Sequence, residues 1–188
     1  MTSHHEHPAG TVRIRPEEPA DALAIADVVG AAFAGAAHSA PPVHEGGPPG
    51  EVTLLEWLRE DEGWLPRLAL VAESDGRVVG HVVCTRGSVD GVPALGLGPL
   101  SVHPDRQGEG IGGLLMRETL ARAEEYGEPL VALLGDPAYY ARFGFVPSTR
   151  CGIESPEAEY GDYFQVRTLG AGLHPRGRFT YAAPFSRL

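Results

Sequence analysis

Apolar residues in the first third of the chain recur at helical spacing. One such stripe predicts a helix over residues 20–34, whose entry is bracketed by Pro16 and Pro19. A second stripe predicts a helix over residues 51–60. The intervening segment, HSAPPVHEGGPPG, contains too much Pro and Gly for a regular element, so we expect a mobile loop near the substrate. The residues expected on the inner faces of the two helices are Ile25, Val28, Val29, Ala32, Phe33, Leu54, Leu55 and Leu58.

Strand-like patterns follow this helical region. After a first short strand over 12–15, three apolar runs over 68–73, 77–85 and 94–102 are separated by Ser-Asp-Gly and Asp-Gly turns, which join antiparallel neighbours. The third run contains Gly96, Gly98 and Pro99, which weaken a regular ladder. We therefore expect a bulge there, or a place where the strand stops pairing with its neighbour.

The second half of the chain returns to helical spacing before further strands. A helix is expected over 110–126, ending at Gly127, and the apolar run 130–134 is then reached by a crossover and should lie parallel to the strand before the helix. A brief helix over 137–143 and two or three strands in the tail complete an α/β domain on a mixed, mostly antiparallel sheet with about four helices. The side chains expected inside the long helix are Leu115, Met116, Thr119, Leu120 and Ala123.

Length and composition restrict this domain further. The 188 residues suffice for one core, so we expect a single domain over 11–188 after a disordered tail over 1–10. The formal net charge of −10 disfavours nucleic acid as a partner. We expect no membrane span and a cytoplasmic location, and the two distant cysteines fit a reducing compartment. The tail histidines lack a fixed set of further ligands, so we expect no metal.

A glycine-rich run, DRQGEGIGG, lies between the third strand and the long helix. Free main-chain N–H groups and the positive end of the helix dipole make this position suitable for a phosphate-bearing ligand. A Cβ at Gly108, Gly110 or Gly112 would obstruct the approach of a phosphate. The alternative is a glycine turn that only packs the helix on the sheet.

Two other phosphate motifs resemble this run in part. The Walker form fails because no Lys-Ser or Lys-Thr follows the glycines. Gly108, Gly110 and Gly113 satisfy the dinucleotide pattern, and Asp136 follows at roughly the distance of a ribose-binding acid. However, that pattern should follow its strand almost directly and begin a series of βαβ units. An antiparallel meander precedes it here, so context disfavours a dinucleotide binder.

Gln107, Gly110 and Gly112 match the pattern Q/R-x-x-G-x-G/A, and Tyr140, Gly144 and Phe145 match Y-x-x-x-G-F. With these motifs the chain resembles the GNAT N-acetyltransferases, most closely a bacterial subgroup described as YhbS-like. The resemblance implies the GNAT fold, in which two strands splay apart to admit the pantetheine arm of acetyl-CoA. It implies cofactor-binding roles for the main chain of Leu100, Ser101 and Val102 and, at the diphosphate, of Gln107, Gly108, Glu109, Gly110, Ile111, Gly112 and Gly113.

The resemblance also implies direct attack of a neutral amine on the thioester. Tyr140 is then the candidate general acid for the departing thiolate, because a phenol of pKa about 10 can donate a proton to it; the alternative is an aromatic residue at the edge of the core. Tyr139 should point away and act as packing or substrate wall. Glu51, His81 and His103 are candidate bases, each with a structural alternative. The third strand carries no acid, which departs from family members with a base there.

These inferences lead to an acetyl-CoA-dependent enzyme acting on a primary amine of a small molecule or peptide, with no nucleic acid or membrane partner and a homodimer as a possible assembly. The acidic charge could steer a cationic amine to the site, although it could equally serve solubility. A non-catalytic module that senses acyl-CoA is the alternative. The residues do not identify the acceptor.

Overall fold

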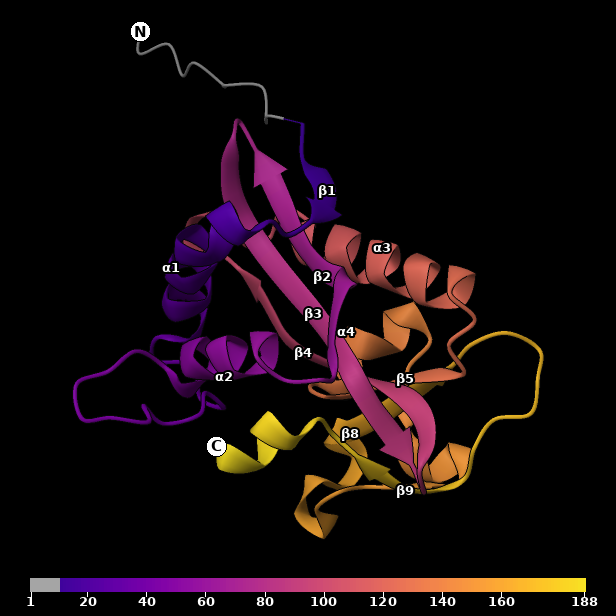
Figure 1. Ribbon diagram of the computed structural model, residues 1–188. Coiled ribbons are helices and arrows are strands. Elements are labelled where there is room, and N and C mark those ends of the chain that lie inside the picture. The colour runs from indigo at the N-terminus through magenta and orange to yellow at the C-terminus, as the bar shows by residue number, and fades with distance from the viewer. Residues whose placement is uncertain (1–10) are drawn as a thin grey trace, which may run out of the picture.

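The computed structural model describes residues 11–188, which form a mixed sheet with helices on its faces (Figure 1). The predicted tail over 1–10 lies outside the described residues. The elements are β1 (Arg13–Pro16), α1 (Ala22–Phe33), α2 (Gly50–Arg59), β2 (Trp64–Ser74), β3 (Arg77–Val89), β4 (Val92–Val102), α3 (Ile111–Glu125), β5 (Leu130–Leu134), α4 (Pro137–Tyr140), β6 (Val146–Pro147), β7 (Ile153–Glu154), β8 (Phe164–Thr168) and β9 (Gly177–Thr180).

The sheet runs in the order β1-β2-β3-β4-β5-β8-β6, and β9 pairs with both β3 and β7. β1 to β4 are an antiparallel meander, whereas β5 lies parallel to β4 after the α3 crossover. β8 is again antiparallel to β5. The predicted mixed, mostly antiparallel architecture is confirmed.

The two hairpins of the meander turn where the sequence predicts. Asp75 and Gly76 have φ values of 50° and 72°, and Asp90 and Gly91 have 45° and 81°. Two consecutive residues with positive φ are the requirement of the type I′ turn, whose twist matches that of paired strands. The Asp-Gly pairs therefore fix the register of β2, β3 and β4.

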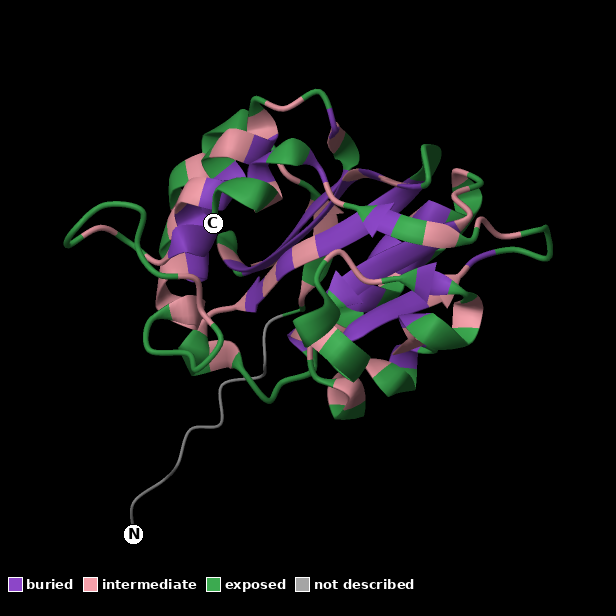
Figure 2. Ribbon diagram, turned by 90° about the horizontal axis from the view of Figure 1, so that it is seen from below, coloured by how far each residue is buried: buried purple, intermediate pink, exposed green. Residues whose placement is uncertain are grey.

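Alternate residues of β2 belong to different cores, so the sheet is covered on both sides. Leu68 and Leu70 pack in the core that includes α3, whereas Ala69 and Val71 pack in the core that includes α1 and α2. Figure 2 shows the central strands as a continuous buried layer between partly exposed helices. A third core lies under the C-terminal strands and includes Phe164 and Phe179.

Some boundaries differ from the sequence-based expectation. β3 continues to Val89 instead of ending near Thr85, and β2 begins at Trp64 instead of Leu68. Polar and proline residues interrupt the apolar pattern in these extensions, but Trp64 still pairs with Thr85 of β3, and residues 86–89 of β3 still pair with β4. The tail forms four short strands instead of two or three, two of them only two residues long.

The predicted bulge in β4 is present. Val82 pairs with Leu100 and Cys84 with Leu97, so that Gly98 and Pro99 together face Val83. The peptide bond between them is cis. Pairing of β4 with β5 covers only residues 95–97, and beyond Leu97 the two strands separate. The main chain after the bulge is consequently left without a strand neighbour on the β5 side.

Candidate functional site

Two cavities meet where β4 leaves β5. The first, called here the groove, has a volume of about 550 Å³ and lies between the start of α3 and the segment 139–143. The second, called the aromatic cavity, has a volume of about 840 Å³ and lies between α1, α2, the bulge and the C-terminal segments. Leu100 and Tyr140 contribute to the walls of both. Leu100 and Tyr140 therefore lie between the two cavities, in the walls of both.

The groove is floored by main-chain N–H groups at the start of α3. The first hydrogen bond of this helix runs from the N–H of Leu114 to the carbonyl of Gly110, at 3.1 Å. The N–H groups of Ile111, Gly112 and Gly113 thus have no partner within the helix, and no side chain caps it. Together with the helix dipole, this arrangement favours an anion.

Two glycines keep this anion site open. Gly108 and Gly110 have φ values of 81° and 82°, and a Cβ at either position would point into empty space. L-residues with a side chain rarely adopt such φ values, because the Cβ approaches the neighbouring carbonyl. A residue larger than glycine at either position would put its side chain into the space that an anion would occupy.

The side chains of Gln107 and Glu109 are engaged within the protein. Gln107 Nε2 donates to the carbonyl of Val102 at 3.0 Å, and the Glu109 carboxylate accepts from Arg106 Nε at 2.9 Å. This contact with the Arg106 guanidinium holds the pKa of Glu109 below its ordinary value. The main-chain N–H groups of the loop are therefore available to an anion, and the charge of Glu109 is already paired with Arg106.

Cationic side chains line the groove, and sequence reasoning missed them. Arg106, Arg117 and Arg142 are all in its walls. The Arg142 guanidinium lies 4.6 Å from the centroid of the Tyr139 ring, which holds it in place. Arg117 lies one helical turn after Gly113, a spacing that could have revealed it in the sequence. In a chain of net charge −10, three arginines in one groove indicate an anionic ligand.

The main chain of β4 beyond the bulge presents two residues to the groove. The N–H of His103 donates to the carbonyl of Val79 at 2.9 Å, so hydrogen bonds to β3 fall on odd-numbered residues here. Ser101 therefore faces β3, and the main-chain groups of Leu100 and Val102 point to the open side. Of the three predicted pantetheine-binding residues, the strand alternation leaves the main chain of Leu100 and the N–H of Val102 available, because the Val102 carbonyl accepts from Gln107.

Tyr140 is held by α4 and by neighbouring rings. Pro137 begins this helix and the Asp136 carboxylate caps it, accepting from the N–H of Ala138 at 2.9 Å. The Tyr139 ring lies edge-on at 4.9 Å from the Tyr140 ring. Burial, and secondarily Tyr139, raises the pKa of Tyr140 above its ordinary value, so the phenol keeps its proton. Tyr139 itself belongs to the wall of the groove.

The aromatic cavity gathers residues that lie far apart in the sequence. Of the 14 aromatic residues in the chain, six line this cavity: Phe33, Tyr140, Tyr160, Phe179, Tyr181 and Phe185. Four of them belong to the tail, where the sequence shows no periodic pattern that would identify them. Glu51 and Glu157 are the acidic side chains in the wall.

Glu51 lies in the wall of the aromatic cavity at the start of α2. Its side chain is buried, with 7% of the residue exposed. One carboxylate oxygen accepts from the N–H of Ala40 at 2.7 Å and the other from Ser39 Oγ at 3.0 Å. Glu51 thus joins the loop before α2 to the helix and also presents a carboxylate to the cavity.

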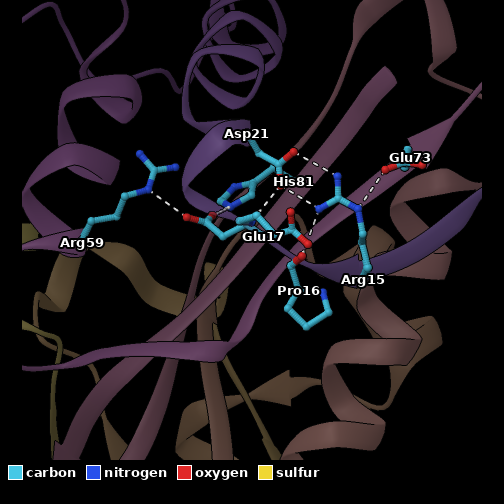
Figure 3. Close-up of polar contacts among 8 residues, drawn as sticks. Arg15, Pro16, Glu17, Asp21, Arg59, Glu73 and His81 are labelled. Carbon is cyan, nitrogen blue, oxygen red and sulfur yellow. Dashed lines mark hydrogen bonds and ion pairs between the residues drawn. The ribbon is translucent and has the colours of Figure 1, made fainter. Parts of the chain in front are cut away.

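His81 is placed elsewhere, on β3 in a polar cluster with Glu17 and Arg59 (Figure 3). The residue has no exposed surface, and its Nε2 lies 2.6 Å from a Glu17 carboxylate oxygen. Burial lowers the pKa of His81, so it is neutral. Burial alone would raise the pKa of Glu17, but hydrogen bonds from His81 and Arg59 outweigh it and lower the pKa. His81 lines neither cavity, and this placement does not favour a role as base.

His103 lies near the groove without lining it. Its Nδ1 accepts from the N–H of Asp105 at 3.3 Å and caps the short turn before the glycine-rich loop. Within residues 11–188, no group of three or more His, Cys, Asp or Glu side chains could hold a metal ion. Over the same residues, no helix has the length and apolar character that a membrane crossing requires.

Comparison with known proteins identifies similar chains. The family model of the acetyltransferase (GNAT) domain matches residues 66–147. The uncharacterised N-acetyltransferase YjhQ of Escherichia coli K12 is 40% identical over 101 residues, which are 52% of this chain and 56% of YjhQ. This chain thus spans about half the length of the curated relatives it matches.

Two solved structures are similar over nearly their whole length. A GNAT family acetyltransferase from Brucella melitensis, in complex with acetyl-CoA, is 38% identical, with 94% of this chain and 99% of that chain covered and a TM-score of 0.74. YhbS from Escherichia coli, in complex with CoA, is 31% identical, with 97% and 96% covered and a TM-score of 0.80.

Proposed function

Because this chain belongs to the GNAT family of acetyltransferases, we propose that it transfers an acetyl group from acetyl-CoA to a primary amine of a small molecule or peptide. The observation that carries the proposal is the junction of the groove with the aromatic cavity at Leu100 and Tyr140. A donor in the groove and an acceptor in the cavity would meet there. Two relatives of known structure hold acetyl-CoA or CoA.

The groove suits the anionic half of acetyl-CoA. The free N–H groups from Gly108 to Gly113 would hold the diphosphate, and Arg106, Arg117 and Arg142 would offset its charge. The main-chain groups of Leu100 and Val102 would bond the pantetheine amides as an additional strand does. An N–H of this segment can also polarise the thioester carbonyl and stabilise the oxyanion.

Each proton transfer of the reaction can be assigned to a residue of this site or to solvent. The amine nitrogen forms a bond to the thioester carbon, and the carbon–sulfur bond breaks. The ammonium form of the acceptor first loses a proton, through water, to Glu51 or to solvent, and Tyr140 gives its proton to the departing thiolate. The new amide nitrogen loses its second proton as Tyr140 is reprotonated, so one proton is released for each acetyl group transferred.

Burial of Tyr140 has two effects on this role. It keeps the phenol protonated, so that the acid is present throughout the usual pH range. The same buried surroundings also raise the pKa of the departing coenzyme A thiol, so its thiolate needs a proton donor. The two shifts act together, because the donor and the leaving group share one desolvated junction.

Tyr140→Phe tests the proposal. We expect kcat to fall about 100-fold, since one general acid contributes about that much, while the calorimetric Kd of acetyl-CoA stays within about twofold. Tyr139→Phe is the matched control, because Tyr139 is adjacent and lines only the groove; its kcat should stay near that of the wild type. Undiminished kcat in Tyr140→Phe would contradict the assigned role.

A panel of amines separates the enzyme from the acyl-CoA sensor and the dinucleotide binder. Release of free CoA from acetyl-CoA in the presence of an amine supports an enzyme. Calorimetric binding of acetyl-CoA without turnover of any amine would instead favour the sensor. We expect no binding of NAD in the same titration, and NAD binding comparable to that of acetyl-CoA would revive the dinucleotide alternative.

A further inference from the structure

The walls of the aromatic cavity indicate the chemical class of the acceptor. We propose that the acceptor is a compact amine with an aromatic or flat apolar body, whose ammonium group is recognised by Glu51 and whose body lies against Tyr181 and Phe185. This inference rests on the proposed acetyl transfer and names its substrate class. It depends on five observations: the aromatic content of the wall, the rigidity of Tyr181, the buried acid, the contacts of the C-terminal turn with α2, and the charge pattern of the wall.

Aromatic residues are concentrated in this wall. Six of the chain's 14 aromatic side chains line the cavity, whereas the groove has only Tyr139, Tyr140 and Phe143. Aromatic rings offer large apolar contact area and prefer edge-to-face or offset contact with another ring. They also attract a cation over their faces. A ligand with both a ring and an ammonium group uses both properties.

Tyr181 is fixed before any ligand arrives. Its ring centroid lies 4.8 Å from that of Phe179 and 4.7 Å from that of Phe185. A Cβ built at Gly96 would lie only 2.6 Å from Tyr181 Cδ1, so the absence of a side chain on β4 gives the ring its place. The ring therefore lies against β4 beside the bulge. A wall fixed in this way costs little entropy on binding.

Tyr181 lines the cavity and is half-buried, and its side chain makes no hydrogen bond to another of residues 11–188. Burial, followed by Tyr160 and Tyr140, raises the pKa of Tyr181, so the hydroxyl is neutral. The wall is then aromatic and uncharged at this point, which suits a ring.

Glu51 is the one buried acid among the described residues of the wall, since Glu157 is exposed. Each Glu51 oxygen accepts one hydrogen bond, from Ala40 or Ser39. A carboxylate has about four acceptor positions, so capacity for an ammonium donor remains. A charge-assisted hydrogen bond in this partly apolar setting is stronger than one in water.

The C-terminal turn contacts α2 and the loop before it at the edge of the cavity. The Arg187 guanidinium lies 5.5 Å from the centroid of the Trp57 ring on α2. A Cβ at Gly50 would come within 2.9 Å of Leu188 Cδ2 and 2.8 Å of Ala40 Cβ, so these segments touch at the start of α2. A long peptide that extended past the start of α2 would have to displace these contacts, whereas a compact amine would not.

The charge pattern of the wall disfavours a polyamine. Binding of several ammonium groups requires several acids along the cavity, but Arg178 lies in the same wall as the exposed Glu157. The guanidinium of Arg178 donates to the carbonyl of Pro156, which fixes a positive charge at this rim. One buried acid fits one ammonium group.

Acceptor selectivity tests the inference. With acetyl-CoA as donor and free CoA as the readout, we expect kcat/KM for phenethylamine to exceed that for n-butylamine, spermidine and a lysine-containing peptide by about 10-fold or more. Equal or higher kcat/KM for the aliphatic amines or the peptide would overturn the inference while leaving the acetyltransferase function intact. If no amine is turned over, calorimetric binding of phenethylamine to the CoA-loaded protein supports this site and its absence contradicts it.

Two pairs of variants separate recognition from folding. Tyr181→Ala should reduce the ratio of kcat/KM between phenethylamine and n-butylamine to near unity, whereas Tyr181→Phe keeps it. Glu51→Gln can retain the hydrogen bonds to Ala40 and Ser39, and the Michaelis constant for phenethylamine should rise about 10-fold in this variant, because the charge that holds the ammonium group is lost. Glu56→Gln, at an exposed position of α2 that lines neither cavity, is the control, with KM changed less than about twofold. An unchanged ratio in Tyr181→Ala, or an unchanged KM in Glu51→Gln, would contradict the assignment.

Discussion

The groove and the aromatic cavity share Leu100 and Tyr140, but the groove is formed mainly by main-chain groups and the aromatic cavity mainly by side chains. The groove uses main-chain N–H groups and strand edges from one continuous stretch, with arginines around them. The aromatic cavity uses side chains from the loop before α2, the bulge of β4 and the last thirty or so residues. A site made from main chain constrains the sequence to glycine at defined positions, whereas a site made from side chains can change at each position.

This difference predicts how each cavity tolerates substitution. The groove depends on main-chain geometry that only a few small residues permit. The aromatic cavity depends on side chains from several segments of the chain. Changes in the groove should therefore abolish donor binding, whereas changes in the cavity should redirect the acceptor.

The largest effect is expected from Gly110→Val. A β-branched residue at a φ of 82° is strained, and its side chain would cover the free N–H groups. Losing one or two charge-assisted hydrogen bonds weakens acetyl-CoA binding about 100-fold, measured by calorimetry. Gly127→Val is the matched control: Gly127 has a φ of 73° and open space at the other end of α3. A similar loss of affinity in both variants would mean that helix stability, not the anion site, sets binding.

Gly96→Ala addresses the cavity while sparing the groove. The added methyl group would displace the Tyr181 ring, so the KM for the preferred amine should rise about 10-fold while the Kd of acetyl-CoA stays unchanged. Gly30→Ala serves as control, because a Cβ there would make an ordinary contact of 3.7 Å with Val52. Equal changes in KM and in Kd for acetyl-CoA would show that the two cavities do not act separately.

A smaller effect is expected from Arg117→Gln. The charge lies at an exposed rim of the groove, where screening is strong, so we expect acetyl-CoA to bind about three- to fivefold more weakly at low salt. The difference from the wild type should shrink at high ionic strength. Calorimetric titrations at two salt concentrations measure it, and a difference independent of salt would argue against an electrostatic contribution.

The His81–Glu17 pair should affect stability and neither cavity. The folded protein keeps His81 neutral, whereas the unfolded chain binds a proton below the ordinary pKa of 6.5, so stability decreases as the pH falls through that value. Glu17 has a lowered pKa, and its contribution is lost as the pH falls below its ordinary 4.5. Thermal unfolding between pH 8 and 5 should show a shallower decline in Tm for His81→Gln than for the wild type. Equal slopes would contradict a neutral His81.

The sequence predicted those features that depend on local chemistry. The Asp-Gly hairpins, the α3 stripe ending at Gly127 and the bulge at Gly98-Pro99 each follow from residues within a few positions of one another. The glycine-rich loop was identified for the same reason. Its predicted contacts with acetyl-CoA, and the acid role of Tyr140, stay predictions that the variants above test.

The sequence alone did not predict the features that depend on contacts between distant residues. The burial of His81 against Glu17 results from the pairing of β1 with β2 and of β2 with β3, which no local pattern specifies. Likewise, the position of Tyr181 depends on Gly96, some eighty-five residues earlier. The orientation of Ser101 toward β3 required the strand register. Long-range register and packing decide these placements, and single-sequence patterns carry little information on either.

The central claim is that the free N–H groups at the start of α3 hold the diphosphate of coenzyme A. Titration of ¹⁵N-labelled protein with CoA, and separately with pantetheine, which lacks the diphosphate, tests it most directly. We expect saturable shifts of the Gly108, Gly110, Ile111, Gly112 and Gly113 amide signals with CoA alone, and shifts of Leu100 and Val102 with both ligands. Binding of CoA that leaves the glycine-loop amides unshifted would contradict the account.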